Sequence, residues 1–180
     1  MKTILPLVLL LTAATAQAAT RDEADRRIRK GHEDYYRTKC HGDEAIADIV
    51  ELHYMIAALR EWRLSNWVNG YEIDLDLLTA EQLVAEAADL YALGCRALVN
   101  AMTEKNLAVL AMIDPADADQ AVLKMDGCDA WLLVANTAFD LAQNRCDEAR
   151  AVLRPWMAQM AGSGGGVGTG GNGGGPGAIP

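Results

Sequence analysis

The stretch from Thr79 to Ile113 constrains the fold most, because it is long, contains few helix breakers and repeats apolar residues at steps of four and three. That spacing places side chains on one face of a helix. The face comprises Val84, Ala88, Tyr91, Cys95, Leu98 and Met102. Thr79, followed by Gln82 three residues later, fits a capping box. We therefore expect an amphipathic helix over residues 79–113, around which the rest of the chain packs.

Two further segments carry the same spacing. Residues 43–64, with Asp43 as the expected cap, present a stripe of Ala45, Ile49, Leu52, Ile56 and Leu59. Asp114-Pro115 suits a helix cap and a first-turn proline, and the stripe that follows contains Met125, Cys128, Leu132, Ala135, Phe139, Ala142 and Cys146. Asp126-Gly127 can kink or divide that helix.

Charge-dense residues 20–39 predict a solvated helix that is weakened by Gly31 and broken at Cys40-His41-Gly42. Residues 147–160 predict a final helix, kinked at Pro155. Between residues 64 and 79, Asn69-Gly70 is a turn signal, and apolar residues then alternate with acidic ones. We expect an extended connection there, with a short hairpin as the alternative. The predicted fold is an all-α, irregular bundle of four or five helices.

The two ends of the chain differ from this helical body. A lysine, an apolar run and Ala16-Gln17-Ala18 predict a signal peptide over residues 1–18. The helical domain is then 19–161, and the Gly-rich residues 162–180 predict a disordered tail. No other run is long and apolar enough to be a membrane span. We expect a periplasmic or secreted protein.

The net charge of the chain restricts the classes of partner that it can bind. The formal net charge is −9, and cleavage of the signal, which contains Lys2, makes it −10. An acidic chain is a poor ligand for nucleic acids and anionic membranes, whose phosphates need Lys and Arg. It is compatible with a basic protein partner.

Four cysteines, Cys40, Cys95, Cys128 and Cys146, are an even number in a chain that is expected to be exported, which predicts two structural disulfides. Their wide spacing argues against zinc and thiol-redox sites. Cys128 and Cys146 cannot pair on one continuous helix, because 18 residues rise by about 27 Å. Two pairings remain open: Cys40–Cys128 with Cys95–Cys146, or Cys40–Cys146 with Cys95–Cys128.

We find no motif for catalysis, a cofactor or a metal. The Cys40-His41 dipeptide lacks the first cysteine of a haem-attachment motif, and no phosphate-binding loop or two-histidine zinc spacing is present. Catalytic, cofactor-binding and metal-binding residues are therefore predicted to be none. The chain is predicted to be a non-enzymatic exported protein that acts through protein–protein binding, such as an inhibitor, an immunity protein or an accessory subunit of an envelope assembly.

Two alternatives stay open. One is a small hydrolase whose site is assembled from dispersed residues, with His53, Glu51 and Tyr54 as the first candidates. The other is a carrier that holds an apolar ligand between its helices. A deep cleft joining a histidine to a carboxylate favours the first, and a large apolar pocket favours the second.

Overall fold

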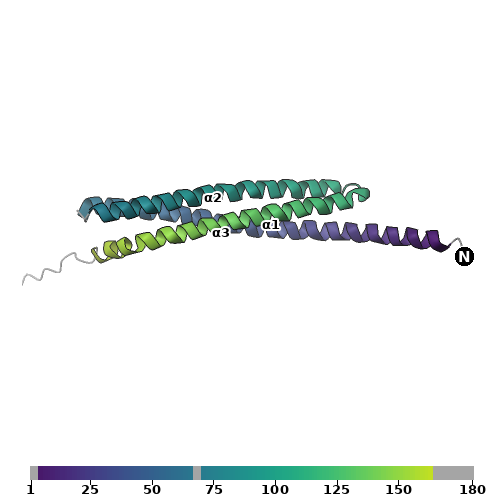
Figure 1. Ribbon diagram of the computed structural model, residues 1–180, viewed down its shortest axis with the longest axis horizontal. Coiled ribbons are helices and arrows are strands. Elements are labelled where there is room, and N and C mark those ends of the chain that lie inside the picture. Colours follow the sequence, from purple (N-terminus) through teal and green to yellow (C-terminus); the bar gives the residue numbers. More distant parts are fainter. Residues whose placement is uncertain (1–3, 67–69, 164–180) are drawn as a thin grey trace, which may run out of the picture.

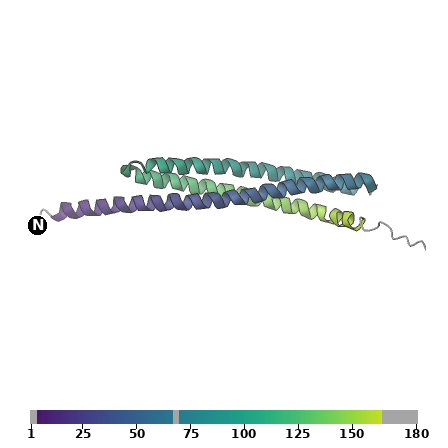
Figure 2. The same ribbon diagram turned by 180° about the vertical axis from the view of Figure 1, so that it is seen from behind.

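The computed structural model describes residues 4–66 and 70–163, which form three long helices lying side by side (Figures 1 and 2). The helix α1 spans Ile4–Asn66, α2 spans Gly70–Ala111, and α3 spans Ala118–Ser163 after a short 3-10 helix, η1, at Pro115–Asp117. α1 and α3 run in the same direction and α2 runs in the opposite one. Both views show α1 extending past the turn that joins α2 to α3.

The described fold is all-helical, but the prediction of four or five helices is wrong. Buried positions continue at alternating steps of four and three through every expected break. In α2 the fully buried positions on this repeat are Ile73, Leu77, Ala80, Val84, Ala87, Gly94, Leu98, Ala101, Lys105 and Ala108. A repeat of 3.5 residues is the spacing of a coiled coil, in which each helix keeps one face against its neighbours. The three helices therefore form a single three-stranded coiled coil.

The expected breaks lie inside these helices. Cys40-His41-Gly42 is part of α1. Both Asp126-Gly127 and Pro155 lie within α3. Local helix-breaking tendencies of about 1 kcal/mol for glycine are small beside the burial of a continuous apolar face.

The segment before residue 79 is also helical. The side chains of Ile73 and Leu77 are buried at helical spacing, which contradicts the extended connection. Thr79 is not a cap, because it lies inside α2 and its Oγ1 donates a hydrogen bond to the carbonyl of Leu75, at 2.8 Å. Asp114 does cap the next element, as predicted, and its carboxylate accepts a hydrogen bond from the amide of Ala116 at 2.9 Å. The Gly-rich tail prediction concerns mainly residues 164–180, which lie outside the described ones.

The largest fully buried side chain sits opposite two glycines. Phe139 of α3 is fully buried, and its ring faces Gly42 of α1 and Gly94 of α2. A Cβ atom at Gly42 would lie 2.8 Å from Phe139 Cζ, and one at Gly94 would lie closer still. Tyr91 and His41 flank the ring, with centroids 5.8 and 5.9 Å away. The glycines are therefore explained by the space that Phe139 occupies, and they do not end the helices.

The predicted disulfides are not formed: all four cysteines are free. Because the helices are continuous, the cysteines lie at different levels and on different faces of the bundle. Cys128 lies in the core beside Gly31, Cys146 is fully buried next to Asp48, and Cys40 is exposed. Cys95 is hydrogen-bonded to Tyr91, whose pKa this contact raises to about 12. Core packing, without covalent staples, holds the helices together.

The Phe139 site predicts a specific pattern of stability. Gly94→Ala should destabilise the fold, because overpacking costs about 1–3 kcal/mol and exceeds the gain in helix propensity of about 1 kcal/mol. Adding Phe139→Leu to that variant should recover part of the loss by making room for the methyl group. Gly127→Ala is the matched control, since its Cβ would be 3.4 Å from the flexible Glu104 side chain, and it should stabilise the fold. Urea unfolding at one protein concentration measures all three; equal effects of the two alanine variants would contradict this packing.

The thiols should differ in reactivity. Burial raises the pKa of Cys128 and of Cys146 to about 11, and only thiolates react with iodoacetamide. At pH 8 we expect Cys40 of the native protein to be alkylated at least 100-fold faster than Cys128 or Cys146. In urea, where the thiols are exposed, all three should react at similar rates. Peptide mapping by mass spectrometry gives the individual rates. Equally fast native labelling of Cys128 or Cys146, or a melting temperature that falls on reduction, would contradict the arrangement.

Candidate functional site

An apolar groove of about 560 Å³ lies between α1 and α2. Its apolar lining comprises Ile56, Ala57, Leu64, Val84, Ala85 and Ala88, and its polar lining comprises His53, Arg60, Glu61 and Glu81. Ile56 and Val84 are core residues that form its floor. The small alanines of α2 leave the volume open above that floor. The groove is open to solvent along one side, so an occupant can enter it laterally.

An ion pair bridges the groove. Arg60 of α1 and Glu81 of α2 lie 2.5 Å apart, and they tie the two helices together at the rim. His53 is held by its own helix, since its Nδ1 lies 2.8 Å from the carbonyl oxygen of Ile49. Leu64 is exposed at the end of the groove, with 72% of its surface accessible. The site thus offers an apolar floor, a charged rim and a large accessible leucine.

The residues suspected of hydrolysis do not converge. His53 lines the groove between α1 and α2, but Glu51 points toward α3, where its carboxylate is 2.8 Å from Arg150. Tyr54 is 74% exposed. General acid–base catalysis needs such groups within hydrogen-bond reach of a common reacting atom. The geometry provides no paired nucleophile and base in the groove.

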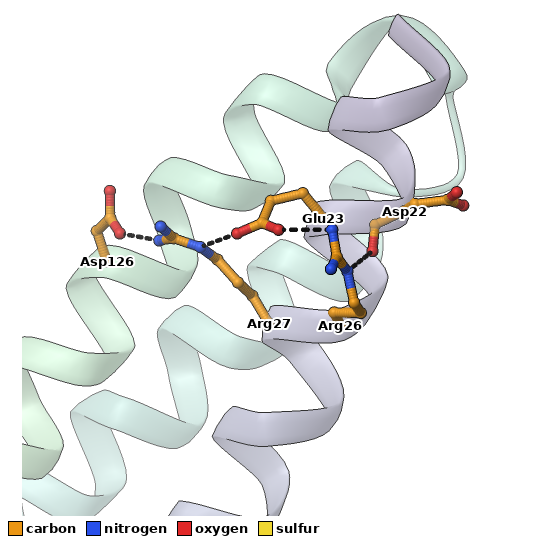
Figure 3. A network of polar contacts seen from close by, with 5 residues as sticks. All are labelled: Asp22, Glu23, Arg26, Arg27 and Asp126. Atoms are coloured by element: carbon orange, nitrogen blue, oxygen red, sulfur yellow. Dashed lines mark hydrogen bonds and ion pairs between the residues drawn. The ribbon is translucent and has the colours of Figure 1, made fainter. Parts of the chain in front are cut away.

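The face between α1 and α3 is polar. His41 Nε2 lies 3.1 Å from Gln143 Oε1 and 3.3 Å from Asp140 Oδ1, and Asn136 donates a hydrogen bond to buried Thr38 at 3.0 Å. At one end of this face, Arg27 pairs with both Glu23 of its own helix and Asp126 of α3 (Figure 3). These partners occupy the side chains that could otherwise bind a ligand.

Arg150 of α3 lies further along the same face. Its guanidinium is 2.5 Å from Asp48, 2.8 Å from Glu51 and 3.1 Å from Asp147. The hydrogen bond to Asp48, the largest cause, raises the pKa of Arg150 above its already high ordinary value. One cation shared by three carboxylates joins α1 to α3 and is fully engaged in the fold.

Neither a metal centre nor a membrane crossing is found in the described part of the chain. Within residues 4–66 and 70–163, no three His, Cys, Asp or Glu side chains gather as metal ligands. The helices of those ranges also lack the combination of length and apolar character that a membrane span requires.

The chain matches no family model, no curated protein and no solved structure. The groove therefore has to be interpreted from its own chemistry. Sequence reasoning missed it as a site, although a signal existed: Ala57 and Ala85 are small residues beside the apolar stripes of their helices. Ala88, which the sequence placed on the stripe of α2, is only half-buried. Trp62, near the end of α1, is half-buried, and its Nε1 donates a hydrogen bond to Ser163 Oγ at 2.9 Å.

Proposed function

We propose that this protein is a non-enzymatic binding protein that receives an amphipathic helix of a protein partner in the groove between α1 and α2. The observation that carries the proposal is the groove itself: an apolar floor between the antiparallel helices α1 and α2, with a charged rim. Helix-in-groove recognition uses such a surface, with apolar anchors at positions i, i+3, i+4 and i+7 of the bound helix. The absence of a converging acid, base and nucleophile in the groove supports binding over catalysis.

The partner's flanks are expected to be basic. Glu61 and Glu81 line the groove beside one cation, Arg60, which is paired with Glu81; Glu72 lies in the first turn of α2, and the whole chain carries a net charge of −9. Opposite charges on two partners raise the rate of encounter and exclude like-charged competitors. A helix with leucines on one side and lysines beside them fits both parts of the site.

We also propose that binding takes place outside the cytoplasm, in the periplasm or after secretion. The support is the charged start, short apolar run and small-residue cleavage pattern of residues 1–18. Ala24 and the later buried positions of α1, which pack against the other helices, all follow residue 18, so cleavage after Ala18 leaves them in place.

An apolar-ligand carrier is the second candidate, because the groove volume of about 560 Å³ falls within the range of small-molecule sites, about 300–1,000 Å³. Such sites bury roughly 70–90% of their ligand. The groove is partly open to solvent, so part of its occupant would stay exposed. This geometry suits a helix, whose far side remains in solvent, better than a free lipid.

A peptide titration tests the main proposal. We expect a labelled helical peptide with leucines at i, i+3, i+4 and i+7 and flanking lysines to bind, measured by fluorescence anisotropy. Replacing its lysines with glutamates should weaken binding at least tenfold. Ala85→Arg, which introduces a long charged side chain from an exposed groove position, should also weaken binding at least tenfold.

Ala151→Arg is the matched control, since it makes the same substitution at an exposed position of α3 outside the groove. It should leave the affinity within twofold. Equal binding of the lysine and glutamate peptides, or equal effects of the two arginine variants, would refute the assignment. The carrier would be favoured if the unaltered protein bound a fluorescent fatty acid but no peptide, and if Ala85→Arg abolished the fatty-acid binding.

A further inference from the structure

A second surface with a distinct chemistry lies between α2 and α3, on the side away from α1. Along α3, Lys124, Trp131, Ala138 and Arg145 follow one another at intervals of seven residues. In a coiled coil every seventh residue returns to the same face. On α2 the facing series, also at intervals of seven, is Glu104, Ala97, Leu90 and Leu83. Both series therefore run along the same outer boundary of the two helices.

Interhelical ion pairs bound this surface at both ends. Lys124 Nζ lies 3.2 Å from Glu104, and Arg145 Nε lies 3.1 Å from Glu86. Between these pairs the helices extend for about 27 Å at 1.5 Å per residue. Most of the intervening side chains are apolar, although the exposed Asn100 lies among them on α2. The exposed apolar ones are Leu93 at 42%, Trp131 at 39%, Val134 at 39% and Leu141 at 47%. We call this surface the α2–α3 patch.

The core of the fold does not need these side chains to be apolar. Ala97 and Ala138 are already buried beneath them, at 1% and 3% exposure. Single exposed apolar residues are normal on a protein surface, but a contiguous group containing tryptophan and rimmed by charge is typical of an interaction site. Ion pairs at the rim and aromatic residues at the centre match the usual anatomy of an interface.

We propose that the α2–α3 patch binds a second copy of this chain, with the two-fold axis parallel to the helices. The reason is the distribution of charge at the rim: both α2 residues, Glu86 and Glu104, are acidic, whereas both α3 residues, Lys124 and Arg145, are basic. A two-fold axis parallel to the helices places α2 of one copy over α3 of the other at the same level. Each rim carboxylate then faces a cation of the partner copy.

The alternative two-fold axis, perpendicular to the helices, places α2 over α2 and α3 over α3. That arrangement sets Glu86 against Glu104 and Lys124 against Arg145 of the other copy, and like charges in contact oppose association. The patch is therefore self-complementary in one of the two orientations. A two-fold contact requires such self-complementarity.

The size of the patch sets the expected affinity. A strip about 27 Å long and two helix diameters wide, about 20 Å, buries on the order of 500 Å² on each copy. That total, about 1,000 Å², is at the lower limit for a specific interface. We therefore expect a reversible dimer with a Kd in the micromolar range. The groove between α1 and α2 lies on another side of α2, so each dimer would carry two grooves.

Complementary charge reversal tests the proposal. Variant one carries Glu86→Lys and Glu104→Lys, and variant two carries Lys124→Glu and Arg145→Glu. Each alone should bind itself at least tenfold more weakly than the unaltered protein does, because its rims become like-charged. An equimolar mixture should dimerise again. Sedimentation equilibrium measures the dissociation constants of the two variants and of their mixture. Protein concentrations between about 5 and 500 µM are on the order of the affinities that such interfaces show.

Two further proteins separate association from folding and from net charge. The chain with all four substitutions restores both interhelical pairs within each copy; it should dimerise with itself and not with the unaltered protein. Lys30→Glu with Arg37→Glu changes the net charge as variant two does but at exposed sites of α1, and it should leave the constant within twofold. An unaltered protein that is monomeric at 500 µM, or a mixture that stays monomeric, would overturn the proposal. Neither result bears on peptide binding in the groove, so the two proposals fail separately.

Discussion

The fold depends on one constraint: three helices must keep the same seven-residue repeat of buried positions over their whole shared length. Much of that repeat is alanine, which contributes little apolar area per residue but lets helix backbones approach closely. Close packing of this kind admits a wide side chain only where the facing residues have no side chain. Phe139 opposite Gly42 and Gly94 is that place. Because the ring fits one level of the bundle, it also fixes how the helices align along their axes, which a uniform alanine seam would leave undetermined.

Polar groups in the seam reinforce that alignment. Lys105 occupies a core position of α2 with 7% exposure, and its Nζ lies 3.1 Å from His32 Nδ1 and 5.4 Å from the centroid of the Tyr35 ring. A shift of α2 by one heptad would leave this ammonium buried without those partners, and a single polar residue in the seam is a known determinant of helix register. Thr38 of α1 and Asn136 of α3, 98 residues apart in the chain, form a similar polar contact between those two helices. Further along, Asp48 and Arg150 pair at a separation of 102 residues. Burying these polar groups costs free energy of folding, and the same groups specify the register of the helices.

The local sequence pattern predicted the buried stripes at 45–59 and 125–146 correctly, but of the stripe predicted for 84–102 only Val84 and Leu98 are buried, and the pattern did not show how far each helix continues. The stripe at Ala45 to Leu59 extends back through Thr38 and Gly31 to Ala24 with the same spacing, so a continuous repeat was legible. It was hidden because Gly31 and Gly42 were interpreted as breakers, a local tendency that the facing Met125 and Phe139 reverse. The cysteines misled for another reason: an even count indicates pairing only if the fold brings sulfurs together, and that depends on helix level and face. The groove depends on distance between α1 and α2, which no single helix pattern encodes.

The three outer faces of the bundle differ in chemistry although they share one core. Between α1 and α3, histidine, amide and guanidinium groups are engaged by partners on the other helix, so that face is used for internal cohesion. The other two faces both involve α2, and both keep apolar groups accessible: Leu64 at the groove, and Leu93 with Trp131 at the α2–α3 patch. Accessible apolar groups lower stability in water relative to polar ones only slightly, but they are the groups whose burial drives association. In both proposed contact surfaces α2 therefore supplies one side, while α1 supplies the other side of the groove and α3 the other side of the α2–α3 patch.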